Sequence, residues 1–497
     1  MARPDSTVSV VTATVLLSIY SAAAAQTFVP PDLSIRAGDP QPFDGFGYGL
    51  AGEGANLLVG ARGSDSTALN GGAIYAFSRV GASWQQVQKI VFPGAQQGDG
   101  IGEALAMAGA VGVAGAPRRG IGGSAFILRF DGGAWFPVTE VTDTSAGSGS
   151  EFGASVDCGA DSVVIGAPSS SEGVGAFAGR VRVFRRDGVL WSSGEVLTAE
   201  FPDPGDRFGF AVAMDGGWLA VSAPGDDDGG VNAGAVWLYR ESGGAFVLIE
   251  KLTPPGPSPA NVECGFGQSI CIDGSRLLVG APRADLAGID AGAVYRFNLG
   301  AKGASPVGVI LPPGPAAACD FGFSVASLGQ VAVIGAPGLT RDGQLSGGAF
   351  VCLDGATSDG VLTASTTGIG LVGARVALAG DSIIAAAPAM TVLTAGYAGQ
   401  LIAIDRTRDC DQSGVPDGIE VAAGALIDGN QDGVPDACQC LPDLSGDGIV
   451  SGSDLALILG FWGTGGSATF DADITNDGIV NAEDLALVLG AWGPCPG

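Results

Sequence analysis

The residues best suited to chemistry lie near the end of the chain, where one acidic pattern occurs twice. The segments DLSGDGIVSGSD (443–454) and DITNDGIVNAED (473–484) place oxygen-bearing side chains at loop positions one, three, five, nine and twelve. Glycine stands at the sixth position and a backbone carbonyl at the seventh, a spacing that calcium uses in twelve-residue loops. The pattern therefore predicts two Ca²⁺ sites, with the ligands Asp443, Ser445, Asp447, Ile449 (carbonyl), Ser451 and Asp454 in the first, and Asp473, Thr475, Asp477, Ile479 (carbonyl), Asn481 and Asp484 in the second.

Each of these loops carries three carboxylates, which repel one another unless a cation neutralises them. We therefore expect the folding of this segment to be coupled to metal binding. Each loop runs into leucines at helical spacing, DLALILG and DLALVLG, which predicts one short helix after each loop. The alternative is that the loops only stabilise the end of the chain as a cap.

The duplicated loop and helix resemble a type I dockerin domain over residues 441–493. The resemblance implies a small α, EF-hand-like calcium-binding domain, assigned to 440–497, and a cohesin-like protein as its partner. In that family the tenth and eleventh loop positions guide recognition. They are Gly452-Ser453 in the first copy and Ala482-Glu483 in the second, which argues against a symmetric, two-way binding mode.

Two further acidic segments precede this domain. DCDQSGVPDGIE (409–420) and DGNQDGVPDAC (428–438) share the pattern D-x-[DN]-x-x-G-V-P-D. Both resemble thrombospondin type 3-like calcium repeats, which implies a calcium-binding linker over 406–439; a flexible polar linker is the alternative. The expected ligands are Asp409, Asp411, Ser413, Asp417 and Glu420 in the first repeat, and Asp428, Asn430, Asp432 and Asp436 in the second.

A large repeated body precedes these loops. Seven segments share an FG-like dipeptide, an apolar strand, a GAP-like tripeptide, a loop and a GGAxYxF-like strand, and they begin at Phe46, Ile101, Phe152, Phe208, Phe266, Phe321 and Ile369. A further strand such as SWQQVQKIVF (83–92) gives four strands per unit, the unit of a β-propeller. The segments resemble the FG-GAP repeat of integrin-α-like propellers over roughly 43–405. The resemblance implies a mainly β fold: a seven-bladed β-propeller, assigned to 26–405 and followed by the small α domain.

The seventh unit lacks its fourth strand, because the chain passes directly from Asp405 into the acidic linker. The missing strand has a candidate at the other end of the chain, in TFVPPDLSIRAGD (27–39). We expect residues 28–35 to complete the last blade and close the ring, which protects sheet edges.

The fourth unit contains the acidic loop GDDDGG, with Asp226, Asp227 and Asp228. Integrin-type blades often carry a calcium loop at this place, so this loop is a candidate for calcium. A solvated acidic turn is the equal alternative.

Composition removes several classes of function. The chain has 497 residues and a net charge of −28, so it lacks the basic surface that nucleic acid requires, and we expect no nucleic-acid partner. It contains no histidine, which excludes catalysis by Ser-His-Asp or Cys-His groups and metal sites built on imidazole. Glutamates and aspartates near the FG motifs (Glu53, Glu103, Glu151, Asp206 and Glu263) show no diagnostic acid–base spacing, and we expect them in surface turns.

The first residues predict secretion. An apolar run from Val8 to Tyr20 and small residues at 23–25 indicate a signal peptide over 1–25, with an uncleaved anchor as the alternative. The apolar segment 366–396 contains Arg375 and Asp381, which favours buried strands, so we expect no membrane span in the mature chain. The expected location is extracellular, and association with the cell surface remains open.

Nine cysteines fit an oxidising compartment. Cys410 and Cys438 bracket the linker repeats, and Cys440 and Cys495 bracket the last domain, although sequence does not fix the pairing. Cysteines of the body such as Cys158 and Cys271 are expected to be buried apolar residues.

These features favour a secreted, calcium-binding, non-catalytic binding or adhesion protein. Its propeller loops would recognise a protein or a glycan, and its dockerin-like end would dock to a cohesin-like scaffold. A dockerin-tethered polysaccharide-degrading enzyme, a hydrolase or lyase of propeller type, is the alternative, for which no catalytic residues can be named. A structural matrix component is a third possibility.

Overall fold

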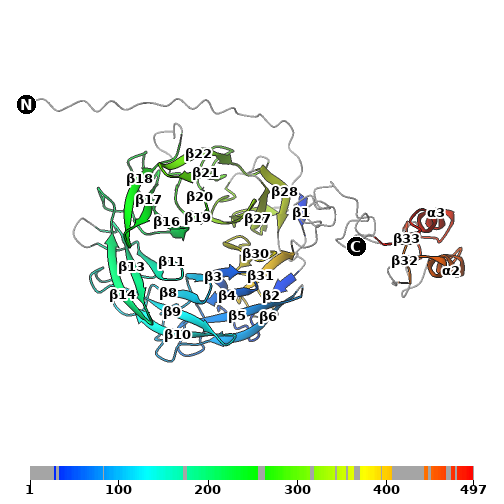
Figure 1. Cartoon of the computed structure of the whole chain (residues 1–497), viewed down its shortest axis with the longest axis horizontal. Helices are drawn as coiled ribbons and strands as arrows, with labels where there is room; N and C mark the ends of the chain where they lie inside the picture. Colours follow the sequence, from blue (N-terminus) through cyan, green and yellow to red (C-terminus); the bar gives the residue numbers. More distant parts are fainter. Residues whose placement is uncertain are drawn as a thin grey trace, which may run out of the picture.

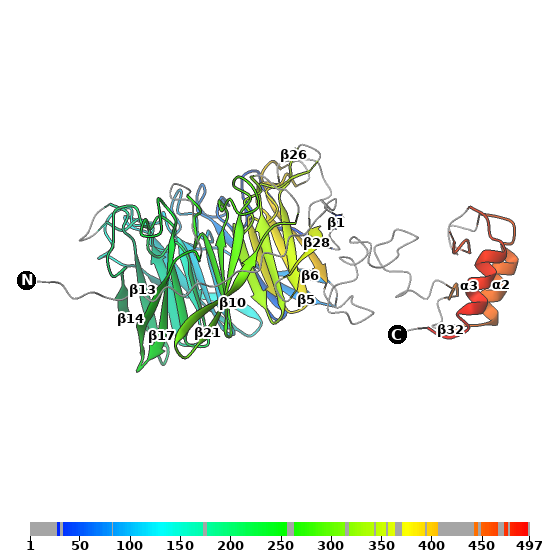
Figure 2. The same cartoon turned by 90° about the horizontal axis from the view of Figure 1, so that it is seen from above.

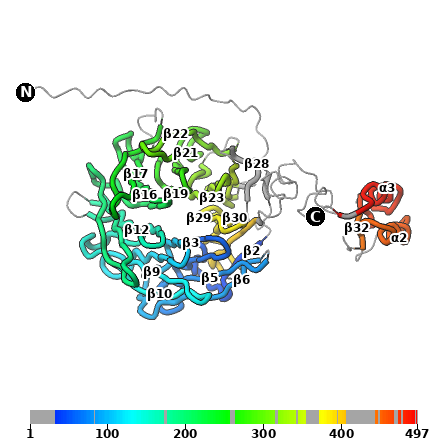
Figure 3. Tube along the Cα trace, in the orientation of Figure 1, coloured from blue at the N-terminus to red at the C-terminus, as the bar shows by residue number. Residues whose placement is uncertain are grey.

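The computed structural model describes residues 27–29, 33–81, 83–171, 176–255, 263–313, 318–341, 344–353, 356–362, 370–392, 395–405, 442–445, 449–465, 472–475 and 478–495. Strands of the first and largest part form a ring of seven sheets, coloured from blue to yellow in Figure 1. Seen from above, the strands run across the thickness of the ring (Figure 2), and the tube in Figure 3 shows the chain passing once around it.

Each of these seven sheets is one blade. In the first five blades the strands lie in chain order from the inside of the ring outward, and in the last two an N-terminal strand is added at the outer edge. The first three blades contain β3 (Phe46–Glu53), β4 (Asn56–Ala61), β5 (Ala73–Val80) and β6 (Ser83–Ile90); β7 (Leu105–Ala108), β8 (Val111–Ala116), β9 (Ser124–Asp131) and β10 (Ala134–Val141); and β11 (Ser155–Cys158), β12 (Ser162–Ala167), β13 (Arg180–Asp187) and β14 (Leu190–Leu197).

The fourth and fifth blades repeat this order. They contain β15 (Val212–Asp215), β16 (Trp218–Ala223), β17 (Ala235–Ser242) and β18 (Ala245–Leu252), followed by β19 (Ser269–Asp273), β20 (Arg276–Ala281), β21 (Ala293–Gly300) and β22 (Gly303–Ile310). The sixth contains β23 (Ser324–Leu328), β24 (Val331–Ala336), β27 (Gly348–Leu353) and β28 (Ala356–Leu362), with the small hairpin β25 (Thr340–Arg341) and β26 (Gln344–Leu345). The seventh contains β29 (Arg375–Ala379), β30 (Ser382–Ala387) and β31 (Gln400–Asp405).

Burial explains why these sequences form blades. Second strands such as β8 and β16 are buried at every position, because neighbouring blades cover both of their faces, and they read as continuous apolar runs. Outer strands such as β6 are largely exposed and therefore contain more polar residues. One apolar core lies between each pair of neighbouring blades, and these seven cores hold the ring together.

The FG and GAP motifs meet at the joints between blades. The amide of Phe152 donates to the Gly122 carbonyl of the preceding blade at 2.8 Å, and its fully buried ring belongs to the core between the two blades. The next residue, Gly153, has a φ of +98° and donates to the Gly166 carbonyl at 2.9 Å. A Cβ at Gly115, the glycine of the preceding GAP motif, would lie 1.9 Å from the Gly153 carbonyl oxygen, so this joint admits no side chain there.

The seventh FG motif is shifted from its expected place. We assigned it to Ile369 and Gly370, but Val372 forms the bridge to Gly347 that Phe321 forms to Gly292 in the preceding joint. Gly373, with a φ of +85°, then takes the glycine position. Valine fills the aromatic position in this blade, so the sequence motif was placed three residues early.

The N-terminal segment closes the ring, but with fewer residues than the expected 28–35. β2 (Leu33–Ile35) pairs with β31 as the fourth strand of the seventh blade. β1 (Thr27–Val29) instead pairs in parallel with β28 and gives the sixth blade a fifth strand. In the sequence, Pro30 and Pro31 stand between the two strands, and proline has no amide hydrogen with which to continue a sheet.

A small module near the end of the chain contains α2 (Gly452–Gly460) and α3 (Ala482–Gly490), and a two-stranded pair of β32 (Ile449–Val450) and β33 (Gly493–Pro494). Figure 2 shows the two helices side by side. The module has its own core of Val450, Ile458, Ala472, Val480 and Val488. Equivalent residues of the two copies, such as Ile458 and Val488, thus pack together.

Candidate functional site

The first candidate site is the loop that leads into α2. The Asp454 carboxylate, fully buried, accepts hydrogen bonds from the backbone amides of Ser445 and Ser451, both at 2.8 Å. Ser451 is the N-cap of α2, and Asp454 completes a capping box with it. Asp454, the twelfth loop residue, therefore holds Ser445 and Ser451, the third and ninth, and stabilises the start of the helix. The structure therefore brings together four of the predicted ligand residues, Asp443, Ser445, Ser451 and Asp454, since Ser445 Oγ also lies 3.3 Å from Asp443 Oδ1.

The second loop repeats this geometry. Asp484 accepts from the amides of Thr475 at 2.9 Å and Asn481 at 2.8 Å, and Asn481 is the N-cap of α3. Asp473 accepts from the amide of Gly478, the glycine at the sixth position, at 2.7 Å. The carbonyl of Ile479 accepts from the Asn481 side chain at 3.1 Å.

The two twelfth-position carboxylates have shifted pKa values. Burial by itself raises the pKa of Asp454, but the hydrogen bonds from the Ser445 and Ser451 amides outweigh it and leave this pKa below its usual value. The same balance, with Thr475 and Asn481 as donors, lowers the pKa of Asp484. Both groups are thus held as anions, the form that ligates a cation.

Several predicted ligands lie outside the described residues. These are Asp447 and Asp477 of the two loops, and the linker residues Asp409, Asp411, Ser413, Asp417, Glu420, Asp428, Asn430, Asp432 and Asp436. The signal peptide over 1–25 also lies outside them. Among the described residues there is no group of three or more His, Cys, Asp or Glu that could hold a metal ion. The donor set that is described, carboxylate, hydroxyl and carbonyl oxygen, matches the chemistry of Ca²⁺.

The acidic loop of the fourth blade already contains a cation from the chain itself. Lys251 Nζ lies 2.6 Å from Asp226 Oδ2 and 2.6 Å from Asp228 Oδ2, and it also lies 4.6 Å from the centre of the Trp237 ring. Asp226 is buried, while Asp227 accepts a hydrogen bond from the backbone amide of Asn232. The ammonium group therefore neutralises the pair that we considered for calcium.

A cavity with a volume of about 500 Å³, which we call the channel, lies at the centre of the ring. Its wall includes one aliphatic side chain from the innermost strand of each blade: Leu50, Leu105, Val156, Val212, Ile270, Val325 and Val376. Four arginines also line it or the adjoining pocket, namely Arg62, Arg118, Arg207 and Arg375. We did not predict this cluster.

Three of the five carboxylates near the FG motifs, Glu103, Glu151 and Asp206, are not the exposed surface residues that we expected. Glu103 and Glu151 line the channel, and Asp206 is buried and accepts from the Asp203 amide at 2.8 Å. Glu53 accepts from the Gly109 amide of the next blade at 2.6 Å. Glu53 is exposed as well, at the end of β3, and Glu263 is an exposed surface residue paired with Arg283.

Glu103 lies at the centre of a group of charged residues with Arg62, Arg118 and Arg375. We call this end of the channel its mouth. The Glu103 carboxylate lies 2.9 Å from Arg62 Nη1 and 2.7 Å from Arg118 Nη2. Arg375 interacts electrostatically with Glu103, Arg62 and Tyr48, and desolvation lowers the pKa of its guanidinium below the usual value. Two guanidinium groups thus pair with one carboxylate, and a third, that of Arg375, lies close enough to feel its charge.

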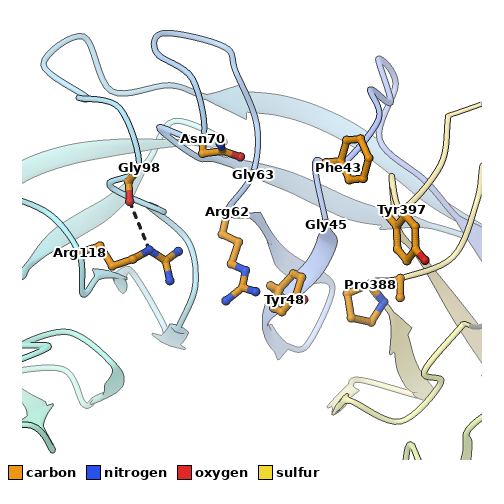
Figure 4. A pocket seen from close by; sticks show the side chains of 11 residues that line it. Phe43, Gly45, Tyr48, Arg62, Gly63, Asn70, Gly98, Arg118, Pro388 and Tyr397 are labelled. Atoms are coloured by element: carbon orange, nitrogen blue, oxygen red, sulfur yellow. Dashed lines mark hydrogen bonds between the residues drawn. The ribbon is translucent and has the colours of Figure 1, made fainter.

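A second pocket of about 560 Å³ adjoins this mouth, where the first and last blades meet (Figure 4). Arg62 lies over the Tyr48 ring at 3.5 Å, and Arg118 donates to the Gly98 carbonyl at 3.2 Å. On the far side of the pocket Phe43 and Tyr397 are stacked, with ring centres 5.8 Å apart. Both of these rings are about half exposed or more, at 68% and 48%.

The described cysteines comprise one disulfide-bonded residue and five free thiols. Cys495 is disulfide-bonded, and its expected partner, Cys440, lies outside the described residues. Cys158, Cys264, Cys271, Cys319 and Cys352 are free; all are buried except Cys271, which is half-buried. Among the described residues no helix is long and apolar enough to cross a membrane.

Comparison with known proteins gives one family match. A model of the FG-GAP repeat matches residues 33–77, 191–239 and 248–297. No curated protein matches the chain. Solved structures that resemble it include a putative 6-phosphogluconolactonase from Bacteroides uniformis (12% identity, 61% of this chain and 80% of that chain, TM-score 0.42) and Sqt1 from Chaetomium thermophilum (14%, 73% and 83%, TM-score 0.42). The chain therefore carries FG-GAP repeats in a seven-bladed β-propeller.

Proposed function

We propose that this chain is a secreted binding protein whose propeller recognises an extracellular ligand. Its C-terminal module, a calcium-dependent docking domain of the dockerin type, attaches it to a cohesin-like scaffold. The linker, as a calcium-binding repeat of the thrombospondin type 3 kind, would hold the two parts at a fixed reach. No step in this function requires a reaction at the propeller.

The observation that carries the docking proposal is the exposed apolar surface of the module. Large apolar side chains are exposed in matching pairs from the two copies: Ile449 and Ile479 at 49% and 45%, Leu459 and Leu489 at 57% and 54%, and Trp462 and Trp492 at 47% and 53%. A module of this size gains nothing for its own stability from six such side chains in water. Exposed apolar groups of this kind mark protein–protein contact surfaces.

Calcium fits the same module through the two loops. Asp443 and Asp473 begin the loops, and Asp454 and Asp484 end them as anions that also cap the helices. When bound, Ca²⁺ would neutralise the carboxylates of each loop and so favour the folded helix pair. Calcium would then act as a condition for docking.

The test is binding of the purified full-length chain to immobilised type I cohesin modules, in calcium and in excess chelator. The proposal expects binding only in calcium, and loss of binding in an Asp454→Ala, Asp484→Ala double variant. A matched control is Asp161→Ala, an exposed aspartate of the propeller. Equal binding in chelator, or release of sugar ends from a polysaccharide panel by the chain alone, would contradict it.

A further inference from the structure

We propose that the channel mouth of the propeller is a binding site for an acidic sugar, with Arg62, Arg118, Arg207 and Arg375 recognising its carboxylate or sulfate. This inference rests on the proposed function, since it names the ligand class of the propeller.

The charge at the mouth is opposite to that of the chain. The chain has a net charge of −28, with 23 basic and 51 acidic residues. Yet the two adjoining pockets are lined by four arginines and by two carboxylates, Glu103 and Glu151, and by no lysine or aspartate. A concave site with a positive local charge attracts anions, because the protein walls focus the field.

The arginines are not fully compensated within the part of the chain that the structure describes. Glu103 pairs with both Arg62 and Arg118, and Glu151 is bonded to the Ser169 hydroxyl. Neither Arg207 nor Arg375 has an ion-pair partner there. Arg375 is close enough to Arg62 for the two positive groups to repel each other. An anion at this place would relieve that repulsion, and guanidinium groups bind carboxylate and sulfate oxygens through paired hydrogen bonds.

The shape suits one small group and not a broad protein surface. The pocket beside the mouth has a volume of about 560 Å³, within the range of roughly 300–1,000 Å³ that small-ligand sites occupy. Arg62 and Arg118 lie on one side of this pocket, and the exposed Phe43–Tyr397 pair lies on the other (Figure 4). A ligand in it would contact charge and aromatic surface at the same time.

The aromatic wall favours a sugar over an acidic peptide. A pyranose ring carries axial C–H groups on a flat face, which pack on aromatic rings, while its acid group projects from the ring edge. The wall offers the exposed rings of Phe43 and Tyr397 for such packing. A peptide would need partners for its backbone amides and carbonyls, and Asn70 is the only side-chain amide of this pocket.

The experiment is calorimetric titration of the full-length chain with trigalacturonic acid, with the neutral trisaccharide maltotriose and with a tri-aspartate peptide, each at low and high salt. The expected result is binding of trigalacturonic acid that weakens with salt and no binding of the other two. Arg375→Gln should weaken binding at least tenfold, and Arg129→Gln, an exposed arginine on β9, should leave it unchanged. Arg207→Gln, from another blade, serves as a second variant if Arg375→Gln does not fold.

The outcomes separate this inference from the proposed function. The acidic-sugar site is overturned if maltotriose binds as tightly as trigalacturonic acid. It is also overturned if Arg375→Gln binds trigalacturonic acid as tightly as the control Arg129→Gln does. In either case the propeller remains a binding domain. Binding of the peptide alone also overturns it and makes the ligand a protein. No binding of trigalacturonic acid overturns it too; docking to cohesin in calcium would then still support the attachment proposal.

Discussion

A Cβ at Gly115 would lie 1.9 Å from the carbonyl oxygen of Gly153, in the neighbouring blade. The same relationship joins Gly280 to Gly322 and Gly335 to Gly373, at 2.0 Å in both cases. In those two joints a serine hydroxyl, Ser269 or Ser324, also donates to the carbonyl of the FG glycine at 2.7 Å. The GAP glycine is therefore required by close contact between blades, and its own φ is not in the left-handed region.

Gly115→Ala should destabilise the propeller by about 1–3 kcal/mol, because the added methyl group must push two blades apart. The matched control is Gly396→Ala, since a Cβ at Gly396 meets no atom within 4 Å. Chemical unfolding of the two variants measures the difference. Equal stability of the two would show that the joint adjusts without cost.

Lys251→Ala should destabilise the fourth blade by about 1–3 kcal/mol, because it leaves the buried Asp226 carboxylate beside Asp228 without a cation. Added calcium should then raise the unfolding temperature of the variant more than that of the unaltered chain, since two carboxylates become available. Lys302→Ala, at an exposed turn, is the control. If calcium stabilises the unaltered propeller equally, the loop binds calcium in the presence of Lys251.

The raised pKa of Asp157 predicts that the stability of the propeller depends on pH. Burial raises this pKa to about 7, with the nearby charge of Asp215 adding to the shift. Because the folded protein holds this proton more tightly than the unfolded chain, stability should be highest in acid and fall as the pH rises towards 7. Asp157→Asn should remove this decrease, and Asp161→Asn should keep it. Unfolding curves between pH 4 and pH 8 measure the stability of both variants. If the stability of Asp157→Asn falls with pH as steeply as that of the unaltered chain, the effect belongs to other groups.

Trp462→Ser and Trp492→Ser should leave the folding of the module intact, because both side chains are about half exposed. Each should weaken binding to a cohesin module about tenfold or more, or about 1.4 kcal/mol, if these rings lie in the docking surface. Leu190→Ser, at a 72% exposed position on the propeller, is the control. Unchanged binding in both tryptophan variants would place the contact elsewhere.

The ring could be predicted because its signals are local and repeated. The FG and GAP motifs recur at every joint, and the second strands are continuously apolar. The seventh FG motif was misplaced because valine, Val372, stands where most other blades have phenylalanine. The arginine cluster could not be found in this way, since Arg62, Arg118, Arg207 and Arg375 belong to four different blades and meet only when the ring is closed. Lys251 was missed for a similar reason: it lies two strands after the acidic loop that it neutralises.

The most direct test of the proposed attachment is limited proteolysis of the full-length chain in calcium and in excess chelator, with cleavage sites identified by mass spectrometry. We expect residues 443–495 to resist cleavage in calcium and to be cut rapidly in chelator, while the propeller is equally resistant in both. Equal protection of 443–495 in chelator, with no calcium retained by the protein, would contradict it.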